Sequence, residues 1–419
     1  MYGLIDCNNF FVSCERVFNP ALNGKSVVVL SNNDGCVVAR SNEAKAMGIK
    51  MGTPAFRLRE LVAAQKVRML SSNYVLYGDM SGRVMSLLAA AVPDLEIYSI
   101  DEAFVKLDGI PDLPVYAKNL ADTISKGTGI PISLGVAPTK TLAKIAGRFA
   151  KKYPRYEQVC LMDTDEKRIK ALQLTRIEDV WGIGRKLSAK LKREGIETAY
   201  DFTLRSAGWA RKTMTVMGER LWRELHGWPC VDMQQDDGDK KQICTSRSFE
   251  KMISDKNILA QAIATHAGAC AYKLRLQHAC AGAIIVFMYT NRHRADLPQC
   301  VRNGYIKLHT PSADTRDVTA AALKALDTIF LKGFQYKKAG VIATDIIPQN
   351  RVERDLFDIG NTDRATYLMH TLDQINDTFP ENKMRFAICG DGTAWKNKRT
   401  LLTPSYTTKL TDIIKIKSA

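Results

Sequence analysis

The stretch Glu96-Ile-Tyr-Ser-Ile-Asp-Glu-Ala-Phe-Val-Lys-Leu107 decides the fold, because it is a run of strand-forming residues with two adjacent carboxylates at its centre. Neighbouring side chains of a regular strand point to opposite faces, so Asp101 and Glu102 serve one site only where the strand pair turns or bulges. Two converging carboxylates also resist joint ionisation unless a cation lies between them. On its own, an Asp-Glu pair is most often a solvated turn, and the rest of the chain must decide.

A third acid, Asp6, ends the first apolar run, residues 1–5. If the strands that end at Asp6 and Asp101 are neighbours, three carboxylates meet at one sheet edge. Such an oxygen-rich set suits Mg²⁺, whose role would be to handle phosphates. A helix begins just after Asp6, and its free N–H groups offer a place for a triphosphate. Of the next two rings, Phe10 fits core packing, whereas Phe11 is placed to press on the sugar of a bound nucleotide.

Composition restricts the class of protein. The chain has 419 residues, enough for about two to four domains, and a net charge of +16. This basic excess favours a polyanionic partner, either nucleic acid or an anionic membrane. No apolar run approaches the roughly 18 residues of a spanning helix, and the N-terminus lacks the pattern of a secretory signal. The ten cysteines are scattered without a C-x-x-C pair, so we expect a reduced, cytosolic protein without a disulfide framework or zinc site.

The residues around the acidic centre predict an α+β layer with an antiparallel core. Strands are expected at 3–6, 26–30 and 131–137, and helices at 41–48, 115–127 and 139–152. Lys45, on the short helix, is a candidate phosphate contact. Polymerases are built on a palm of this kind.

Several motifs, in this order along the chain, resemble those of the Y-family, translesion DNA polymerases. Within that family they are similar to the UmuC-like catalytic subunits of bacterial DNA polymerase V. The motifs are Asp6-x-x-x-Phe10-Phe11, Val27–Asn33 with Asp34-Gly35, Tyr98–Phe104, Gly135–Lys144 and Val180–Arg185. The resemblance runs nearly end to end. It implies a multidomain right-hand fold and a template-directed, error-prone DNA polymerase of the SOS response to DNA damage.

The resemblance also implies roles for individual residues. Asp6, Asp101 and Glu102 would bind two Mg²⁺ ions, with the carbonyl of Cys7 as a backbone ligand. Phe11 occupies the steric-gate position, which excludes a ribose 2′-hydroxyl. The nucleotide-binding residues are expected to be Phe10, Phe11, Asn42, Lys45 and Lys151.

Two features of the sequence affect which of the family's nucleotide contacts are expected in this chain. Asn42 stands where many relatives have a tyrosine, which weakens the transfer of detailed contacts but not of the chemistry. The small residues Gly35, Ala39 and Ser41 are consistent with the open pocket that an error-tolerant polymerase needs.

The residues from Asp179 to Gly195 predict a helix–hairpin–helix. Gly182 and Gly184 allow a tight turn, and the amides that open the next helix would face a DNA phosphate. Arg185 and Lys186 add positive charge at the same place. Residues 161–230 are therefore interpreted as the thumb.

Beyond an acidic linker, the pattern predicts strands at 242–249, 282–290, 302–309 and 336–346 and helices at 255–278 and 315–332. This βαββαβ order indicates one four-stranded sheet with two helices on one face, which matches the little finger of the family. Residues 240–346 hold sixteen Lys and Arg against seven Asp and Glu. An uncovered sheet face would use such charges to hold duplex DNA. The expected DNA contacts are Arg247, Arg292, Arg294, Arg302 and Lys307.

The tail is poor in core signals and is expected to bind partners. Val352–Phe357 resembles the family's peptide for the sliding clamp, with Leu356 and Phe357 as apolar anchors, although Glu353 and Arg354 depart from it. The resemblance further implies primer-template DNA, dNTPs, a UmuD′-like dimer and a RecA filament as partners, and a place at the bacterial nucleoid. The predicted domains are palm at 1–10 and 75–160, fingers at 11–74, thumb at 161–230, linker at 231–241, little finger at 242–346 and tail at 347–419.

Two other functions compete with this interpretation. The first is a DNA-binding scaffold of a damage-response complex with reduced catalysis, against which the retention of all three acids argues. The second is a nucleotide cyclase on a similar palm, which would leave the helix–hairpin–helix and the basic sheet without a use.

Overall fold

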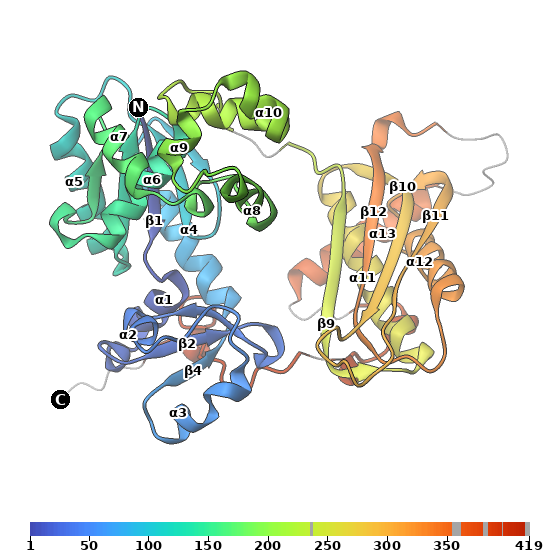
Figure 1. Ribbon diagram of the computed structural model, residues 1–419. Coiled ribbons are helices and arrows are strands. Elements are labelled where there is room, and N and C mark those ends of the chain that lie inside the picture. The colour runs from blue at the N-terminus through green and yellow to red at the C-terminus, as the bar shows by residue number, and fades with distance from the viewer. Residues whose placement is uncertain (235–237, 354–361, 380–383, 396, 415–419) are drawn as a thin grey trace. The chain divides into compact units, whose positions relative to one another are not determined.

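The computed structural model describes residues 1–419 except 235–237, 354–361, 380–383, 396 and 415–419. The chain forms two compact units. Unit 1 contains residues 1–236 together with 400–419, and unit 2 contains residues 237–399. The end of the chain therefore belongs to the same unit as its beginning (Figure 1).

Unit 1 is organised around a five-stranded sheet of order β5-β6-β1-β7-β8. Its strands are β1 (Tyr2–Cys7), β5 (Asp94–Ile97), β6 (Glu102–Lys106), β7 (Ile132–Ala137) and β8 (Val159–Leu161). The helices α4 (Tyr74–Ala91) and α5 (Leu113–Thr128) cover one face, and α6 (Lys140–Lys152) covers the other. Strand alternation explains the division, because Ile5 and Val105 join the core under α4 and α5 whereas Leu4 and Phe104 join the core under α6.

Two glycines let α6 lie unusually close to the sheet. A Cβ placed on Gly135 of β7 would be 2.0 Å from the backbone N of Gly147 on α6. No side chain fits there, so the Gly135–Gly147 contact sets the depth of the helix. Residues projecting from α6 toward the strand ends are thereby brought within reach of the sheet.

Two smaller layers complete unit 1. The segment predicted as the fingers, residues 11–74, holds a three-stranded sheet of order β3-β2-β4, with β2 (Val27–Leu30), β3 (Val37–Arg40) and β4 (Arg68–Ser71). Its helices are α1 (Phe10–Phe18), α2 (Asn42–Ala46) and α3 (Arg59–Ala63). The segment predicted as the thumb, residues 161–230, contains α7 (Asp165–Leu174), α8 (Arg185–Arg193), α9 (Ala199–Thr203) and α10 (Ala207–Leu225).

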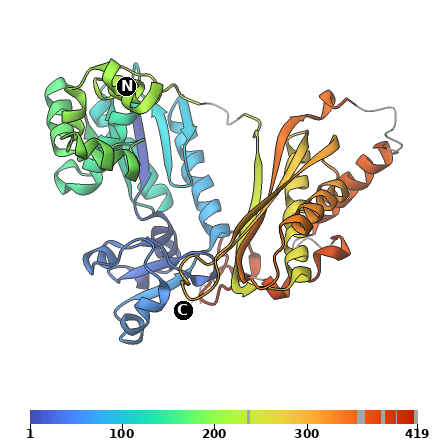
Figure 2. The ribbon, with the colours of Figure 1, turned by 45° about the vertical axis from the view of Figure 1, so that its right-hand side comes forward.

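Unit 2 has the predicted βαββαβ order. Its antiparallel sheet, of order β11-β10-β12-β9, consists of β9 (Ile243–Ile253), β10 (Ala279–Thr290), β11 (Val301–Ser312) and β12 (Tyr336–Pro348). The helices α11 (Lys256–Leu276) and α12 (Thr315–Ile329) pack on one side of this sheet (Figure 2). The predicted α+β architecture and the βαββαβ order of its second part are thus confirmed.

The last part of the chain packs more closely than its sequence indicates. Helix α13 (Thr362–Thr378) is fixed to unit 2 where Arg275 and Asp373 form two parallel hydrogen bonds of 2.7 Å. Trp395 lies against the core of unit 2, and Tyr406 lies against the core of unit 1. Among the helices of the described residues, none has both the length and the apolar character needed to cross a bilayer.

Candidate active site

The three predicted acids come from two strands and the turn before one of them. Asp6 on β1 lies directly opposite Glu102, the first residue of β6. Asp101 lies in the turn between β5 and β6, where its carbonyl accepts a 2.8 Å hydrogen bond from the amide of Cys7. Asp101 and Glu102 therefore lie where the strand pair turns, which is the place where two adjacent acids could serve one site.

The hydroxyl of Ser99 shapes this turn. It accepts hydrogen bonds from the amides of Asp101 and Glu102 and donates one of 2.7 Å to the Asp101 carboxylate. The Asp101 side chain is thus held by its own turn. Asp6 and Glu102 share strand parity with Leu4 and Phe104, so they lie on the face of the sheet that α6 covers.

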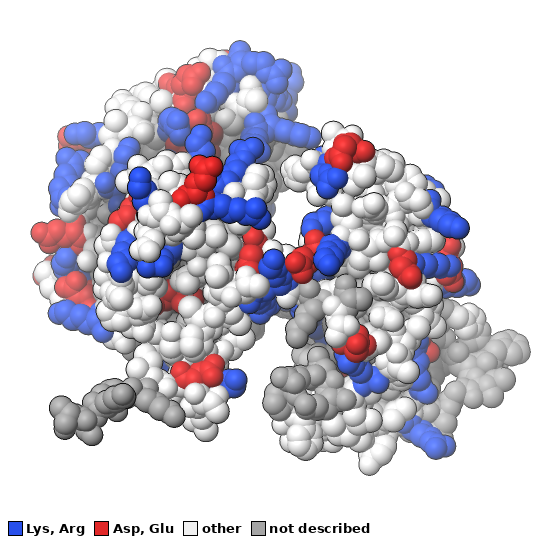
Figure 3. Space-filling view, turned by 90° about the horizontal axis from the view of Figure 1, so that it is seen from below, with Lys and Arg blue, Asp and Glu red and all other residues white. Residues whose placement is uncertain are grey.

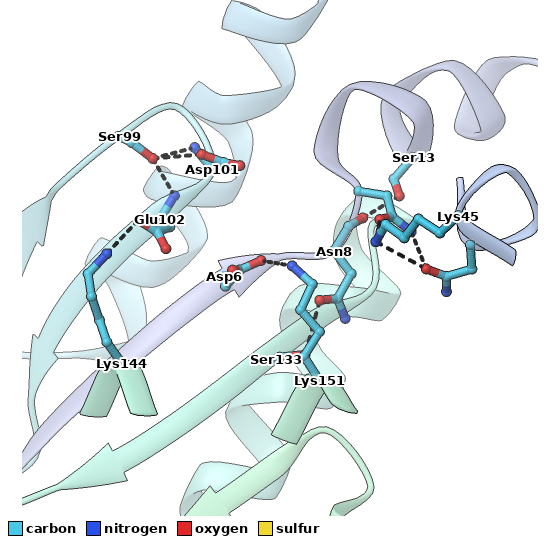
Figure 4. A network of polar contacts seen from close by, with 12 residues as sticks. Asp6, Asn8, Ser13, Lys45, Ser99, Asp101, Glu102, Ser133, Lys144 and Lys151 are labelled. Atoms are coloured by element: carbon cyan, nitrogen blue, oxygen red, sulfur yellow. Dashed lines mark hydrogen bonds and ion pairs between the residues drawn. The ribbon is translucent and has the colours of Figure 1, made fainter. Parts of the chain in front are cut away.

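Two lysines of α6 hold the two opposed acids (Figure 4). Lys151 Nζ lies 2.7 Å from Asp6 Oδ1, and Lys144 Nζ lies 3.0 Å from Glu102 Oε2. The lysines are seven residues apart, which puts both on one side of the helix. Lys144 also lies over the rings of Tyr98 and Trp181, at 4.4 and 5.3 Å from their centroids. The sequence identified Lys151, but it did not identify Lys144 as a partner of Glu102.

The three carboxylates are the type of ligand that a divalent cation binds, although their side chains are not gathered around one point. Among the residues that the structure describes, no three Cys, His, Asp or Glu side chains are gathered as metal ligands. The ammonium groups of Lys144 and Lys151 instead bring two positive charges to Glu102 and Asp6, the charge that one divalent ion would supply. Carboxylate oxygens at the same strand ends are the ligands that Mg²⁺ prefers.

An open cleft of about 310 Å³ lies beside these acids within unit 1. Asp6, Glu102, Lys144 and Lys151 line it, together with Leu4, Ile145, Gly147, Arg148, Asp179 and Trp181. The last two residues come from the segment that leads into the helix–hairpin–helix. The cleft therefore joins the acidic strand ends, the basic side of α6 and the thumb.

A second group of polar residues lies where β1 gives way to α1. Asn9 Oδ1 accepts a hydrogen bond from Lys45 Nζ, and Asn9 Nδ2 donates one of 3.1 Å to Asn42 Oδ1. Burial, and then the positive charges of Lys151 and Arg40, lower the pKa of Lys45. A bound anion would relieve this repulsion. The structure thus brings predicted Lys45 and Asn42 together and adds Asn9, which the sequence marks only as part of a turn-forming Asn-Asn pair.

The two adjacent rings differ in their surroundings, and the burial of Phe10 leaves its predicted contact with a nucleotide without support. Phe10 is 3% exposed and belongs to the core, whereas Phe11 is half-buried. The ring of Phe11 stacks on Tyr77 with centroids 4.4 Å apart and 14° between the planes. Of the small residues expected around the pocket, Ser41 is fully buried and caps α2 through the amide of Ala44, so it serves the helix.

The helix–hairpin–helix has the expected local geometry. Gly182 has φ of +88°, a conformation that a side chain rarely adopts. Gly184 is the N-cap of α8, and its neighbours Arg185 and Lys186 are exposed at the first turn of that helix. The backbone therefore has the turn that the sequence predicts, and this turn presents free amides and the two cationic side chains.

The register of unit 2 corrects the face assigned to two arginines. Arg247 is paired with Ala339 and Arg302 with Met288, and both partners lie in the core beneath α11 and α12. Cross-strand partners point to the same face, so neither arginine extends from the uncovered face. The spacing of buried Ile243 and Phe249 around Arg247 was the sequence signal that predicts this.

The uncovered face carries other residues. Register places Lys307 there beside Tyr305, and Lys338 lies over the rings of Phe287 and Tyr289 at 6.0 and 5.9 Å. Arg292 and Arg294 lie exposed in the connection after β10. Basic side chains are spread over both units on the side shown in Figure 3. Leu356 and Phe357, the predicted clamp anchors, lie outside the described residues.

Comparison with protein families identifies this architecture. The sequence profile of the impB/mucB/samB family matches residues 5–148, and that of the C-terminal domain of the same family matches residues 240–356. A domain of unknown function, DUF4113, matches residues 366–416. Protein UmuC of Salmonella typhimurium is 42% identical over the full length of both chains. The chain belongs to the UmuC-like Y-family DNA polymerases.

Other relatives and solved structures agree with this assignment. Protein ImpB of Salmonella typhimurium is 39% identical over 99% of each chain, and DNA polymerase IV 1 of Mesorhizobium japonicum is 25% identical over 90% of this chain and 83% of that one. A chimera of the Y-family polymerases Dbh and Dpo4 shares the fold, with a TM-score of 0.65 at 21% identity over 83% of this chain and 99% of that chain. This UmuC-like protein is accordingly a DNA-directed DNA polymerase of the translesion class.

Proposed function

We propose that this UmuC-like polymerase extends a primer by two-metal-ion catalysis at Asp6, Asp101 and Glu102. The observation that carries the proposal is the direct pairing of Asp6 with Glu102 beside the turn that holds Asp101. When bound, divalent ions such as Mg²⁺ would lower the pKa of the primer 3′-hydroxyl and stabilise the leaving pyrophosphate. The carbonyl of Cys7 is the backbone ligand expected beside them.

The chain's own residues would orient the nucleotide. Lys151 lies close enough to lower the pKa of Lys45, and both lysines would hold the triphosphate once Lys151 is released from Asp6. Asn9 and Asn42 fix the position of Lys45. The first amides of α1 supply further donors, because a helix N-terminus favours an anion.

Phe11 would act as the sugar gate. Its ring is held flat against Tyr77 and has an edge contact with Tyr74, at 5.9 Å between centroids. A rigid aromatic face at this place would clash with a ribose 2′-hydroxyl and accept a deoxyribose. Error-prone synthesis opposite damaged bases is the physiological activity that we infer from the family.

DNA would be held at two places. The hairpin at Gly182 and Gly184 with Arg185 and Lys186 would contact backbone phosphates in the thumb. In unit 2, Lys307 and Lys338 on the uncovered sheet face, with Arg292 and Arg294 beside it, would hold the duplex. Arg247 and Arg302 lie on the face that α11 and α12 cover, so they are not part of this proposed contact. Clamp binding at Leu356 and Phe357, and association with a UmuD′-like dimer and a RecA filament in the cytoplasm, remain proposals that depend on the family alone.

The test is primer extension with the full-length protein, with and without UmuD′-type and RecA-type partners. Asp101→Ala is expected to abolish nucleotide addition while primer-template binding stays close to wild type. Unchanged extension would refute the catalytic assignment. Primer-template binding without extension by the wild type, even with these partners, would favour the alternative of a DNA-binding scaffold with reduced catalysis. A cyclic nucleotide product formed without template would favour the cyclase.

A further inference from the structure

The end of the chain forms a strap across the fingers. This C-terminal strap, residues 400–406, lies along the end of β4 and the start of α4. The amide and hydroxyl of Thr400 donate to Asp34 Oδ2 at 3.0 and 3.1 Å. The amide of Ser71 donates to the carbonyl of Leu401 at 2.9 Å, and the amide of Leu401 donates to Ser71 Oγ at 3.0 Å. The strap therefore extends the hydrogen bonding of the fingers sheet.

The middle of the strap is fixed by a buried amide, and its far end by a ring. Asn73, 2% exposed, donates through Nδ2 to the carbonyl and the hydroxyl of Thr403, both at 3.1 Å, and to the carbonyl of Pro404 at 3.2 Å. Tyr406 stacks on Phe18 of α1, with centroids 5.0 Å apart and 11° between the planes. Contacts at three successive points make the strap part of unit 1, which agrees with the division of the chain into units.

Thr403 reaches a carboxylate inside the unit. Its hydroxyl donates to Glu15 Oε1 at 3.1 Å, and the hydroxyl of Tyr77 donates to the same oxygen at 2.6 Å. Glu15 is 1% exposed and Tyr77 is fully buried. Within the described part of the chain, Glu15 has no cationic partner, so these two hydroxyl groups are what compensates the buried carboxylate.

The same tyrosine supports the candidate sugar gate. The ring of Tyr77 is the surface on which Phe11 stacks at 4.4 Å. Fixing the Tyr77 hydroxyl fixes the plane of that ring, and hence the height of Phe11 above it. A gate that distinguishes one hydroxyl group must be placed to within a fraction of an ångström. A continuous path of contacts thus joins Thr403, Glu15, Tyr77 and Phe11.

We propose that Thr403, Glu15 and Tyr77 are positioning residues, through which the C-terminal strap sets the placement of Phe11 and the discrimination between deoxyribose and ribose. The proposal rests on the proposed function of Phe11 as the sugar gate. It gives a role to the last part of the segment that matches a domain of unknown function. The strap thereby makes selectivity depend on a segment 388 residues away from Glu15 in sequence.

The experiment measures the ratio of kcat/KM for dNTP and rNTP insertion by the full-length protein, under conditions in which the wild type extends a primer. Thr403→Val removes the hydroxyl but keeps the shape, and is expected to lower the ratio about three- to tenfold, the value of one hydrogen bond. Thr403→Ser keeps the hydroxyl and should retain the wild-type ratio. Thr400→Val, on the same strap but bonded to Asp34, is the matched control and should also retain it.

A second pair of variants tests the path from Thr403 to Phe11 at its tyrosine. Each variant removes a hydroxyl group and keeps the aromatic ring. Tyr77→Phe should lower the ratio about as much as Thr403→Val. Tyr116→Phe should leave it unchanged, because the hydroxyl of Tyr116 donates to the carbonyl of Ala91 at the other end of α4, away from Phe11. If Thr403→Val does not fold, Tyr77→Phe decides the question.

A parallel measurement on Phe11→Ala distinguishes failure of the proposed sugar gate from failure of the strap proposal. If Phe11→Ala leaves the ratio unchanged, the gate itself is wrong and the proposal falls with it. If Phe11→Ala relaxes the ratio while Thr403→Val and Tyr77→Phe do not, the gate stands and the strap proposal is overturned. Equal losses of dNTP and rNTP insertion, with a lowered Tm, would also overturn it, because a merely structural role changes both substrates alike.

Discussion

Charges are paired differently at the acidic strand ends of unit 1 and at two exposed arginines of unit 2. On the palm, Asp6 pairs with Lys151 and Glu102 pairs with Lys144, so each carboxylate on a strand meets a cation on a helix. In unit 2, the exposed residues Arg294 and Arg316 pair with Asp296 and Asp314, two positions away in each case, whereas the less exposed Arg275 pairs with Asp373 of another helix. The first arrangement depends on the fold, and the second depends on the local sequence.

The difference indicates what each surface is suited to do. A carboxylate paired across elements is held at one point, which suits chemistry at a defined atom. Charges supported locally keep their positions when elements shift, and their contributions to holding a polyanion add up. We therefore expect single changes on the palm to have large effects and single changes on the uncovered face of unit 2 to have small ones.

The largest effect is expected for a palm carboxylate. Glu102→Gln should lower the single-turnover rate of primer extension by about 1000-fold or more, because it removes a ligand charge while keeping the shape. Asp327→Asn, which removes an exposed partner of Lys256 in unit 2, is the control and should stay close to the wild-type rate. A Glu102→Gln protein with nearly normal extension would break the comparison.

The next effect tests whether the fold positions the palm charges. Gly135→Ala should destabilise unit 1 by about 3 kcal/mol or more, because the added methyl meets the backbone of Gly147. Gly268→Ala on α11 should instead stabilise unit 2 by about 0.5–1 kcal/mol, since its Cβ would lie 3.5 Å from Thr315 and alanine favours a helix. Urea unfolding measures both, and equal effects would contradict the assigned role of the α6 contact.

A pH effect is expected in unit 2. Burial, and then the charge of Arg247, lower the pKa of His266 to about 4. An unfolded histidine binds its proton near pH 6.5, so unit 2 should have its full stability above pH 6.5 and lose about 3 kcal/mol as the pH falls to 4. Urea unfolding between these pH values measures the loss. His266→Gln should flatten the profile, whereas exposed His293→Asn should not, and an unchanged slope in His266→Gln would assign the effect elsewhere.

The smallest effect is expected on the uncovered face of unit 2. Lys307→Gln and Lys338→Gln should each weaken primer-template binding only a few-fold and reduce the slope of log Kd against log salt by about 1. Lys324→Gln on α12, on the opposite side of the sheet, is the matched control and should leave the slope unchanged. If Lys324→Gln has the larger effect, DNA lies on the helix side and the face assignment must be reversed.

Local sequence signals predicted the elements well. Strand alternation, glycine at the helix–hairpin–helix turn and the strand-helix order of unit 2 all act over a few residues, and the structure has the corresponding elements. Placing Arg247 and Arg302 on the uncovered face was wrong, because the strands were identified without following their alternation to Phe249 and Met288. The domain limits stay predictions, although the division into units joins residues 400–419 to the first unit.

By itself, the sequence determined that three acids lie next to strand ends, that a basic helix follows the third strand, and that a βαββαβ sheet carries excess positive charge. Only the tertiary structure decided that Lys144 pairs with Glu102, that Gly135 sets the depth of α6, and that Thr403 reaches Glu15. The reason is physical: periodicity reports which face of an element is apolar, whereas a contact between distant segments depends on packing, which no local spacing records.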